Sequence, residues 1–557
     1  MTTTRETVGV DALRARAEAW LADDPDPAAR AELRLVLDGL PDTAADLADR
    51  FAAPLTFGTA GLRGPLRAGP NGMNRAVVRA AAAGLVRWLA AHDVDGPVVV
   101  GYDARHGSAE FAAETARVAT GAGREALLLP RVLPTPVLAH AVRALDAAAG
   151  VMVTASHNPP RDNGYKVYLG RALGGPGGDG AQLAPPADAE IEASIRAVGP
   201  LSTVPLGPPG RVLGEEIVAS YVDGAVAVVD PGQPRDLAVA YTPLHGVGGP
   251  LFAQALVSAG FAAPVVVAEQ AAPDPDFPTV AFPNPEEPGA MDRVVALAAS
   301  TGADLAIAND PDADRCAVAI PDPGPAGRGG WRVLRGDEVG VLLADHLMRR
   351  GVRGRYATTV VSSSLLRAVC RSRGVPYGET LTGFKWIVRA GADLAYGYEE
   401  ALGYCVAPAH VRDKDGITAA LLVCELAAGL RAEFRTLGDR LDELALEFGV
   451  YATDQLSVRV DDLAEIDAAM RRVRRRPPVE LLDEPVTVED LLPRADVLIL
   501  RGAGVRVVVR PSGTEPKLKA YLEVVEPVAG GDVPAARERA AASLSALRTE
   551  TATALGL

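Results

Sequence analysis

A loop that follows a short apolar run carries a serine, a histidine and a lysine close together in the sequence. The run is residues 150–153, and Ser156, His157 and Lys166 follow it in a stretch rich in Asn, Pro and Gly. These turn formers predict a loop in which the Ser156 hydroxyl is exposed. A serine beside an imidazole and an ammonium suits phosphoryl or acyl transfer, because both reactions move a proton and a phosphate also needs positive charge. The alternative is a surface turn in which Ser156 only caps the backbone.

A second loop places three aspartates at alternate positions after another apolar run. Residues 305–308 lead into Asp310, Asp312 and Asp314, and Arg315 follows them. Three carboxylates in a short loop can converge on one hard cation, and oxygen ligands favour Mg²⁺ or Mn²⁺ over zinc. An EF-hand is excluded, because Arg315 stands where that loop needs glycine. A phosphatase with an aspartyl nucleophile and a solvated acidic turn both remain open.

Three further loops offer groups suited to a phosphorylated, hydroxyl-rich ligand. After the strand-like residues 505–509, the stretch 510–517 combines an arginine, two hydroxyls and glycine-opened amides, which suit a phosphate that is held but not broken. Residues 397–404 place two glutamates in a glycine-bounded loop, and carboxylates accept hydrogen bonds from sugar hydroxyls. Residues 57–64 form a glycine-rich loop with one arginine, Arg63. Each stretch is also compatible with a simple turn.

The composition describes a large globular chain without general affinity for nucleic acid. The 557 residues exceed one hydrophobic core, so several domains are expected, and the net charge of -15 argues against a nucleic-acid binder. The four cysteines lack Cys-x-x-Cys spacing, which favours a reducing compartment. The sequence shows neither a signal peptide nor a membrane span. We therefore expect a cytoplasmic enzyme whose partner is a small molecule, with no nucleic acid and no membrane.

The elements that must position these loops alternate between apolar strands and alanine-rich helices. This alternation predicts α/β domains with mixed, largely parallel sheets. Three blocks open with strands at residues 98–103, 238–242 and 357–362, and a later strand in each block ends in one of the polar loops. The carboxyl ends of such strands are where α/β folds bind ligands. Residues 10–20 and 28–37 predict two helices of an N-terminal extension.

Stretches rich in Gly and Pro mark the expected domain boundaries. They cover residues 174–209 and 321–330, with a further boundary near 448–454, and the first stretch is expected to be a surface insertion within or just after the first domain. The last segment mixes strands with a helix over residues 534–555, which predicts a smaller α+β domain. The predicted division is a helical extension over residues 1–50, followed by domains over residues 51–210, 211–322, 323–448 and 449–557.

Taken together, the loops resemble those of the α-D-phosphohexomutase superfamily, the family of phosphoglucomutases and phosphomannomutases. The resemblance runs over residues 55–521, and four motifs occur in family order: phosphoserine loop, metal loop, sugar loop and phosphate loop. It implies four domains around a central cleft, each contributing one loop. Residues 57–64, 380–386 and 412–416 are closest to the branch with the second type of phosphoglucomutase and the phosphopentomutases. Ala401 departs from the pattern, because many hexomutases carry serine two residues after the sugar-binding glutamate.

The resemblance implies a mutase that moves a phosphoryl group between the 1- and 6-positions of a hexose phosphate, glucose or mannose. Phosphorylated Ser156 would donate its phosphoryl group, giving a bisphosphorylated intermediate, and would recover one from the other end of the sugar. One Mg²⁺ per chain and a sugar bisphosphate as activator are also implied. The alternative is a phosphopentomutase acting on ribose or deoxyribose phosphates, followed by a metal-dependent sugar phosphatase and a non-catalytic sensor of sugar phosphates.

The resemblance also assigns roles to individual residues. The metal ligands would be Ser156, Asp310, Asp312 and Asp314. The catalytic residues would be Ser156 with Arg63 and Arg315, which position the phosphoserine, and the acid/base candidates His157, Lys166 and Lys414. The substrate-binding residues would be Thr382, Gly383, Glu399, Glu400, Arg510, Ser512, Gly513, Thr514 and Lys517.

Overall fold

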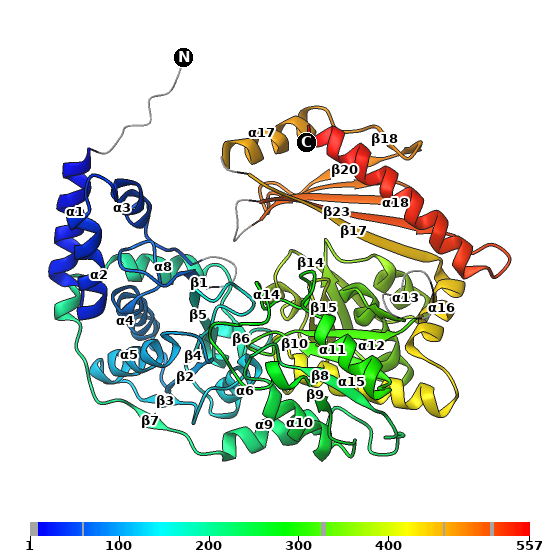
Figure 1. Cartoon of the computed structure of the whole chain (residues 1–557), viewed down its shortest axis with the longest axis horizontal. Helices are drawn as coiled ribbons and strands as arrows, with labels where there is room; N and C mark the ends of the chain where they lie inside the picture. The colour runs from blue at the N-terminus through cyan, green and yellow to red at the C-terminus, as the bar shows by residue number, and fades with distance from the viewer. Residues whose placement is uncertain are drawn as a thin grey trace. The chain divides into compact units, whose positions relative to one another are not determined.

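The computed structural model describes residues 9–57, 61–322, 324, 330–460, 463–512 and 517–556. The chain forms two compact units, and each unit is discontinuous in sequence. The first contains Met1–Pro231, Ala238–Ala317 and Ala407–Leu421, and the second contains Gly232–Leu237, Val318–Val406 and Leu422–Leu557 (Figure 1). Over the described ranges, no helix has both the length and the apolar character required to cross a bilayer.

Three helices form the N-terminal extension of the first unit: α1 (Val10–Asp23), α2 (Pro27–Asp38) and α3 (Ala44–Arg50). The Asp26 side chain accepts a hydrogen bond from the Ala28 amide and so caps the start of α2. Leu33 and Leu47 are fully buried in the core that the helices share. The two helices predicted over residues 10–20 and 28–37 are confirmed.

The first domain is built on a seven-stranded mixed sheet. Its strands are β1 (Leu62–Pro65), β2 (Val98–Tyr102), β3 (Ala126–Leu128), β4 (Ala149–Val153), β5 (Asp162–Leu169), β6 (Ala181–Gln182) and β7 (Arg211–Val212). Their order is β1-β5-β4-β2-β3-β7, with β6 paired to β5. Strand β2 is parallel to β3 and β4, whereas β5 is antiparallel to β1 and β4. Every residue of β4 is buried, which explains why the strand reads as a continuous apolar run.

Helices cover this sheet. They are α4 (Arg75–Ala91), α5 (Ser108–Gly121), α6 (Thr135–Ala144), α7 (Arg171–Gly174) and α8 (Ala187–Arg196), followed by the short helix η1 (Leu201–Thr203). The stretch 174–209 therefore contains regular structure and forms an integral layer of the domain, which corrects the expectation of a surface insertion. Its helix α8 packs on α4 with Ile191 fully buried. At Gly84 of α4, an added Cβ would lie 2.4 Å from Ile195 Cγ1, so the two helices approach too closely for a larger residue.

The next block of the chain carries the acidic loop. Its elements are α9 (Glu216–Val226), β8 (Val239–Thr242), α10 (Gly249–Ser258), β9 (Val265–Val266), η2 (Ala268–Gln270), α11 (Asp292–Thr301), β10 (Leu305–Asn309), β11 (Cys316–Pro321) and β12 (Trp331–Val333). Strand β8 is parallel to both β9 and β10, and β11 is antiparallel to β12. All five residues of β10 are buried, so this strand holds the start of the acidic loop firmly in the first unit.

The second unit holds a third α/β domain. Its elements are α12 (Gly336–Arg349), β13 (Arg355–Thr359), α13 (Leu365–Arg373), β14 (Tyr377–Thr380), α14 (Phe384–Ile387), β15 (Leu394–Glu399), β16 (Gly403–Cys405), the C-terminal part of α15 (Gly416–Ala432) and α16 (Leu437–Phe448). The sheet order is β14-β13-β15-β16, with β13 parallel to β14 and β15 and β16 antiparallel to β15.

The C-terminal domain is a smaller antiparallel sheet with helices. Its elements are β17 (Val450–Arg459), α17 (Leu463–Arg475), β18 (Glu480–Leu481), β19 (Glu484–Pro485), β20 (Thr487–Asp490), β21 (Leu498–Arg501), β22 (Val505–Pro511), β23 (Lys517–Glu526) and α18 (Val533–Leu555). The main sheet has the order β17-β23-β22-β21-β20, and α18 packs along β17 and β23 (Figure 1). The predicted fold class, three α/β domains followed by a smaller α+β domain, is confirmed.

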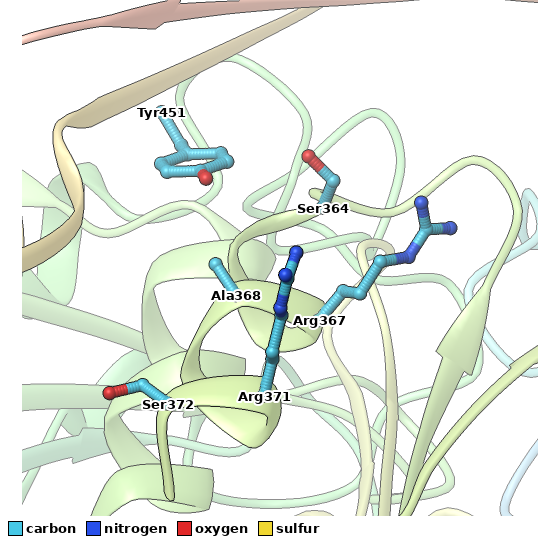
Figure 2. Close-up of a pocket in the computed structure, with 6 residues that line it drawn as sticks. All are labelled: Ser364, Arg367, Ala368, Arg371, Ser372 and Tyr451. Atoms are coloured by element: carbon cyan, nitrogen blue, oxygen red, sulfur yellow. The ribbon is translucent and has the colours of Figure 1, made fainter.

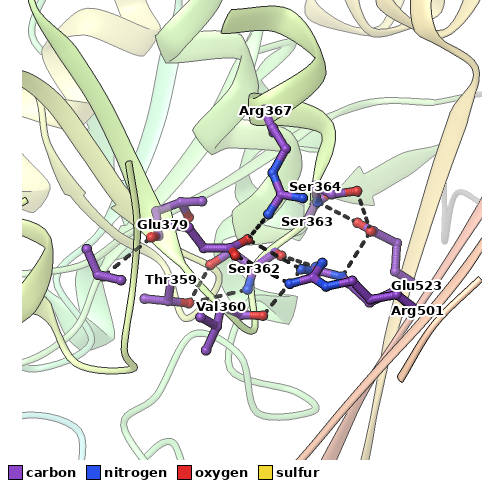
Figure 3. A network of polar contacts seen from close by, with 12 residues as sticks. Thr359, Val360, Ser362, Ser363, Ser364, Arg367, Glu379, Arg501 and Glu523 are labelled. Atoms are coloured by element: carbon purple, nitrogen blue, oxygen red, sulfur yellow. Dashed lines mark hydrogen bonds and ion pairs between the residues drawn. The ribbon is translucent and has the colours of Figure 1, made fainter. Parts of the chain in front are cut away.

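A buried polar network joins this C-terminal sheet to the loop that follows β13 (Figure 3). The Arg506 guanidinium donates to the carbonyl oxygens of Val360 and Ser362, and its Nε lies 3.2 Å from Glu523 Oε1. The Glu523 carboxylate in turn accepts hydrogen bonds from the amide and the hydroxyl of Ser364, at 2.7 and 2.6 Å. Arg506 and Glu523 are both buried. Their hydrogen bonds and their ion pair offset the cost of removing two charges from water.

Candidate active site

Ser156 follows the carboxyl end of β4, and its side chain faces Asp310 of the acidic loop. Its φ of 52° lies in the left-handed region, which is uncommon outside glycine and marks a constrained turn. The hydroxyl donates a 2.8 Å hydrogen bond to Asp310 Oδ2 and lies 3.2 Å from His157 Nδ1. Ser156 is only 3% exposed, so the expectation of an exposed hydroxyl is wrong. The turn formers were recognised correctly, but the left-handed turn directs the side chain onto the acidic loop.

The backbone of the serine loop is held by Arg105, a residue that the sequence did not single out. Its guanidinium donates hydrogen bonds of 2.6 to 3.1 Å to four carbonyl oxygens of the loop, those of Ser156, Asn158, Pro159 and Asp162. Arg105 is itself buried, and it lies just after β2, beside the strand that carries the serine. The only signal in the sequence was its position beyond the carboxyl end of a predicted strand.

The three aspartates form a compact acidic cluster beside Ser156. One carboxylate oxygen from each of Asp310, Asp312 and Asp314 can be chosen so that all three lie within 4.8 Å of one another, and all three residues are buried. Within the part of the chain that the structure describes, Asp312 Oδ1 and Asp314 Oδ1 have no hydrogen-bond partner. Buried carboxylate oxygens without donors are what a hard cation requires as ligands. The donor set therefore fits a divalent cation bound by oxygen.

The cluster has uneven electrostatics. Burial, followed by the charges of the other two aspartates, raises the pKa of Asp310 well above its ordinary value. Burial also acts to raise the pKa of Asp314, but Lys166, Lys414 and Arg315 outweigh it and hold that pKa far below its ordinary value. Asp312 has a lowered pKa for a similar reason, with Lys166 offsetting burial. Mutual repulsion is therefore strongest at the carboxylate that touches Ser156.

Cationic side chains, among them the acid/base candidates Lys166 and Lys414, lie beside the cluster. Lys166 Nζ lies 2.7 Å from Asp312 Oδ2 and 3.1 Å from Asp314 Oδ2, and Lys414 Nζ lies 3.3 Å from the same oxygen of Asp314. Thr135 was not predicted, yet its hydroxyl donates a 2.6 Å hydrogen bond to Asp312 Oδ2. The ammonium groups fix two of the three carboxylates and supply positive charge next to the serine.

Two arginines and the histidine complete the surroundings of Ser156. Arg63 Nη1 donates to Asn158 Oδ1 at 2.8 Å, and the amide of Arg315 donates to Asp310 Oδ1 at 3.1 Å. Burial, together with the charges of Arg315 and Arg63, lowers the pKa of His157 well below its ordinary value. His157 is therefore neutral near pH 7 and is suited to accept a proton from the Ser156 hydroxyl. All predicted catalytic residues thus lie in one cluster of the first unit.

The predicted sugar loop lies in the second unit, at the end of β15. Glu399 is buried at that end, and the Glu400 carboxylate accepts hydrogen bonds from the hydroxyls of Ser362 and Thr359, at 3.0 and 3.3 Å. Thr382 and Gly383 precede α14, and Gly383 has a φ of 110°, which residues with a Cβ rarely adopt. Glu400 is therefore tied to its own domain, and its predicted contact with the substrate stays a prediction.

We expect Asp337, next to this loop, to make the protein less stable as the pH rises from about 4 to about 7. Burial, with a contribution from Glu400 and Glu523, raises its pKa to about 7, even though Ser363 and Tyr398 donate hydrogen bonds to it. The folded state thus keeps the proton to a higher pH than the unfolded chain does, and stability is lost as that proton leaves. The variant Asp337→Asn cannot ionise, and its amide oxygen can still accept the hydrogen bonds from Ser363 and Tyr398.

Urea unfolding at several pH values between about 5 and 8 checks this expectation. The wild type should lose more stability over that interval than Asp337→Asn, whereas Asp292→Asn, a change at an exposed residue, should behave as wild type. Equal losses in wild type and Asp337→Asn would contradict the assignment.

The predicted phosphate loop connects β22 and β23 of the C-terminal sheet. The Ser512 amide donates to the Lys517 carbonyl oxygen at 2.7 Å, which closes the loop, and Arg510 lies opposite Lys519 in the ladder. Gly513 and Thr514 lie outside the described residues. The described residues thus place the arginine and one hydroxyl at the same end of this hairpin.

A cavity of about 520 Å³ also lies in the second unit, over α13 (Figure 2). Its lining residues are Ser364, Arg367, Ala368, Arg371, Ser372 and Tyr451. Three of the polar groups there are already engaged, because Ser364 binds Glu523, Arg367 binds Glu379 and Ser372 contacts Glu447. None of the residues predicted from the sequence for the site lines this cavity.

Family profiles match the chain in four consecutive segments. Profiles of phosphoglucomutase/phosphomannomutase alpha/beta/alpha domains I, II and III match residues 54–200, 219–324 and 335–448, and that of the C-terminal domain matches residues 456–540. The chain belongs to the phosphoglucomutase/phosphomannomutase family. The resemblance inferred from the four loops is thereby confirmed.

Individual members of the phosphoglucomutase/phosphomannomutase family are similar to this chain over most of its length. A probable phosphomannomutase from Haemophilus influenzae is 45% identical over 81% of this chain and 93% of its own length. A phosphoglucomutase from Staphylococcus aureus is 33% identical over 86% of this chain and 90% of its own. The fold matches that of a phosphoglucomutase/phosphomannomutase family protein from Burkholderia thailandensis, with a TM-score of 0.64, 19% identity, and coverage of 89% of this chain and 97% of that one.

Proposed function

We propose that the protein is a hexose-phosphate mutase that moves a phosphoryl group between the 1- and 6-positions of glucose or mannose phosphates, with Ser156 as the phosphoryl carrier. The observation that carries this assignment is the buried Ser156 hydroxyl, which contacts both Asp310 and His157 in a cluster with two ammonium groups. Membership of the family supports the reaction class, an isomerisation by phosphoryl transfer. The named relatives favour hexoses, so phosphopentomutase, the alternative considered from the sequence, is not favoured.

The reaction consists of two phosphoryl transfers, and the bonds and protons balance over the pair. In the first, a sugar hydroxyl attacks the phosphorus on Ser156, a new sugar O–P bond forms and the Ser156 Oγ–P bond breaks. The hydroxyl proton passes to a base of the site, and Ser156 Oγ leaves with a proton from an acid of the site. In the second, Ser156 Oγ attacks the phosphorus at the other end of the bisphosphorylated sugar, and the neutral imidazole of His157 accepts the serine proton. The sugar oxygen leaves with a proton, so no water is consumed and the enzyme regains its phosphoserine.

The charge of the transferred group is met by the residues around Ser156. Lys166, Lys414 and Arg63 are cations of the same unit, and they would hold the phosphoryl oxygens in both transfers. Mg²⁺ would be held by Asp310, Asp312 and Asp314, and when bound it neutralises charge on the phosphoryl oxygens. Arg105 would keep the serine in line by holding the carbonyl groups of its loop.

The remaining predicted residues would bind the rest of the substrate. The Glu399 carboxylate would accept hydrogen bonds from sugar hydroxyls. The hydroxyl and backbone groups of Thr382 and Gly383 would make further hydrogen bonds to the sugar. Arg510, Ser512 and Lys517 would hold the phosphate that is not being transferred, because an arginine fork suits phosphate oxygens. A sugar bisphosphate would act as activator by phosphorylating Ser156.

The direct test is incubation of the purified protein with glucose 1-phosphate, mannose 1-phosphate and ribose 1-phosphate, each with Mg²⁺ and a sugar bisphosphate. We expect the hexose 1-phosphates to be converted to the 6-phosphates with little release of inorganic phosphate. Sustained release of phosphate without isomer formation would instead identify a phosphatase.

We expect the residue at position 401 to affect the choice of sugar. Ala401 lacks the hydroxyl that serine would place two residues after Glu399, so one hydrogen bond to the sugar is available in Ala401→Ser and missing in the wild type. A hydrogen bond in a desolvated site is worth about 0.5 to 3 kcal/mol, so Ala401→Ser should raise the hexose-to-pentose ratio of kcat/KM by roughly 2- to 100-fold. The two rates measured in both proteins give that ratio, and an unchanged ratio would show that position 401 does not contact the sugar.

A further inference from the structure

Residues 407–416 belong to the first unit, although the chain just before residue 407 and just after residue 421 belongs to the second. The chain leaves the first unit at Ala317, and the segment Ala407–Leu421 joins it again. Arg143 Nη1 donates hydrogen bonds to the carbonyl oxygens of Pro408 and Ala409, at 2.7 and 2.8 Å. The segment therefore docks on the first domain before it reaches the acidic loop, and it carries Lys414 with it.

We propose that Tyr168 and Tyr221 are positioning residues that clamp this segment and thereby hold Lys414 on Asp314. Lys414 lies between two aspartates, and each of these accepts a hydrogen bond from one tyrosine. Tyr168 OH donates to Asp413 Oδ2 and Tyr221 OH donates to Asp415 Oδ1, both at 2.9 Å. The proposal rests on the proposed function, because it assigns Lys414 a place in phosphoryl transfer.

The clamp acts on the backbone on both sides of Lys414. The second oxygen of Asp413 accepts a 2.8 Å hydrogen bond from the Lys414 amide. The same oxygen of Asp415 that receives Tyr221 also accepts the amides of Ile417 and Thr418, which caps α15. Each tyrosine thus fixes a carboxylate that in turn fixes the peptide groups around Lys414.

Burial makes these two contacts strong. Tyr168, Tyr221, Asp413 and Asp415 are all at most 2% exposed, so a hydroxyl removed from either tyrosine leaves a buried carboxylate short of a donor. Burial, followed by the adjacent aspartate, raises the pKa of both tyrosines well above the ordinary value. The hydroxyl groups consequently stay protonated and act as donors throughout the neutral range.

Close backbone packing joins the clamped segment to the acidic loop. The Gly416 amide donates to the Ala313 carbonyl oxygen at 3.2 Å, and an added Cβ at Gly416 would lie 2.2 Å from the Arg315 carbonyl oxygen. Lys414 Nζ lies 3.3 Å from Asp314 Oδ2 in this arrangement. A shift of the segment would therefore move the Lys414 ammonium away from Asp314 and would also strain the Gly416–Ala313 hydrogen bond.

The test compares Tyr168→Phe, Tyr221→Phe and the double variant with the wild type and with Tyr396→Phe. The Tyr396 hydroxyl also makes a buried 2.8 Å hydrogen bond, to the Gly340 carbonyl oxygen, but in the second unit. Each variant keeps its aromatic ring. Two quantities are measured: amide hydrogen exchange of peptides covering residues 407–416, and kcat and KM for glucose 1-phosphate with Mg²⁺ and a sugar bisphosphate.

We expect faster exchange in residues 407–416 in both single variants and not in Tyr396→Phe. We also expect kcat to fall about tenfold in each single variant and roughly a hundredfold in the double one, with KM little changed, because small misplacement of a reacting group mainly affects the transition state. Unchanged exchange, or faster exchange with unchanged kcat, would overturn the proposal. If the wild type isomerised no sugar phosphate, the proposed function would fail, and the exchange comparison would still decide whether the tyrosines clamp the segment.

Discussion

Ser156→Ala is expected to lower mutase activity by about four to six orders of magnitude, the loss typical of removing a nucleophile. The substitution deletes the oxygen that lies 2.8 Å from Asp310 and 3.2 Å from the His157 imidazole. The two side chains that contact Ser156 Oγ, a carboxylate and an imidazole, do not supply an alcohol oxygen in its place. The variant should fold, because it loses only the two hydroxyl contacts and keeps the hydrogen bonds that Arg105 makes to the backbone of the loop.

Steady-state assays and intact-protein mass spectrometry measure this directly. The wild type should carry a phosphoryl group on Ser156 in a fraction of molecules, and Ser156→Ala should carry none. Ser300→Ala, at an exposed serine of α11, is the matched control and should keep both activity and phosphorylation. Phosphate confined to a different serine, together with an active Ser156→Ala, would refute the assignment.

Asp312→Asn is expected to weaken Mg²⁺ binding about 100-fold and to lower activity in proportion at limiting metal. The substitution removes one of three anionic ligands and leaves Lys166 with Asp314 alone. The loss of the buried ion pair with Lys166 is partly offset by relief of repulsion among the three carboxylates, so the metal-free variant should melt slightly below the wild type. The rise in melting temperature on adding Mg²⁺ should also shrink.

A Mg²⁺ titration followed by both activity and thermal melting separates the two effects. Asp292→Asn serves as the control, because it removes a carboxylate from an exposed position. Full activity of the wild type in excess chelator would rule out a metal requirement. A large drop in the metal-free melting temperature of Asp312→Asn would show that Asp312 is mainly structural.

The sequence predicted those parts of the site that depend on local pattern. Apolar strands that end in polar loops located Ser156, the aspartates and Glu399 correctly at strand ends, because short-range alternation reports burial directly. The orientation of Ser156 could not be predicted in the same way. Whether a loop hydroxyl faces water or a carboxylate depends on a partner 154 residues away, and periodicity within the loop contains no record of that partner.

Contacts between distant segments account for the other omissions. Arg105 and Thr135 follow strand ends without any distinctive motif, and their role appears only when they are seen against Ser156 and Asp312. Tyr168 reads as one more apolar residue of β5, although its hydroxyl meets Asp413. The helix α8 was missed because the surrounding Gly and Pro residues hid a short amphipathic pattern.

The return of residues 407–421 to the first unit has a consequence for synthesis on the ribosome. Asp314 and Lys414 are 100 residues apart, and translation proceeds at roughly 5 to 20 residues per second, so the aspartates emerge about 5 to 20 seconds before Lys414 does. During that interval the nascent first unit carries the acidic cluster with Lys166 as its sole ammonium neighbour among the described residues. A cation bound at the cluster, or a delay in closing the unit, would compensate for the absence of the positive charge that Lys414 later places beside Asp314.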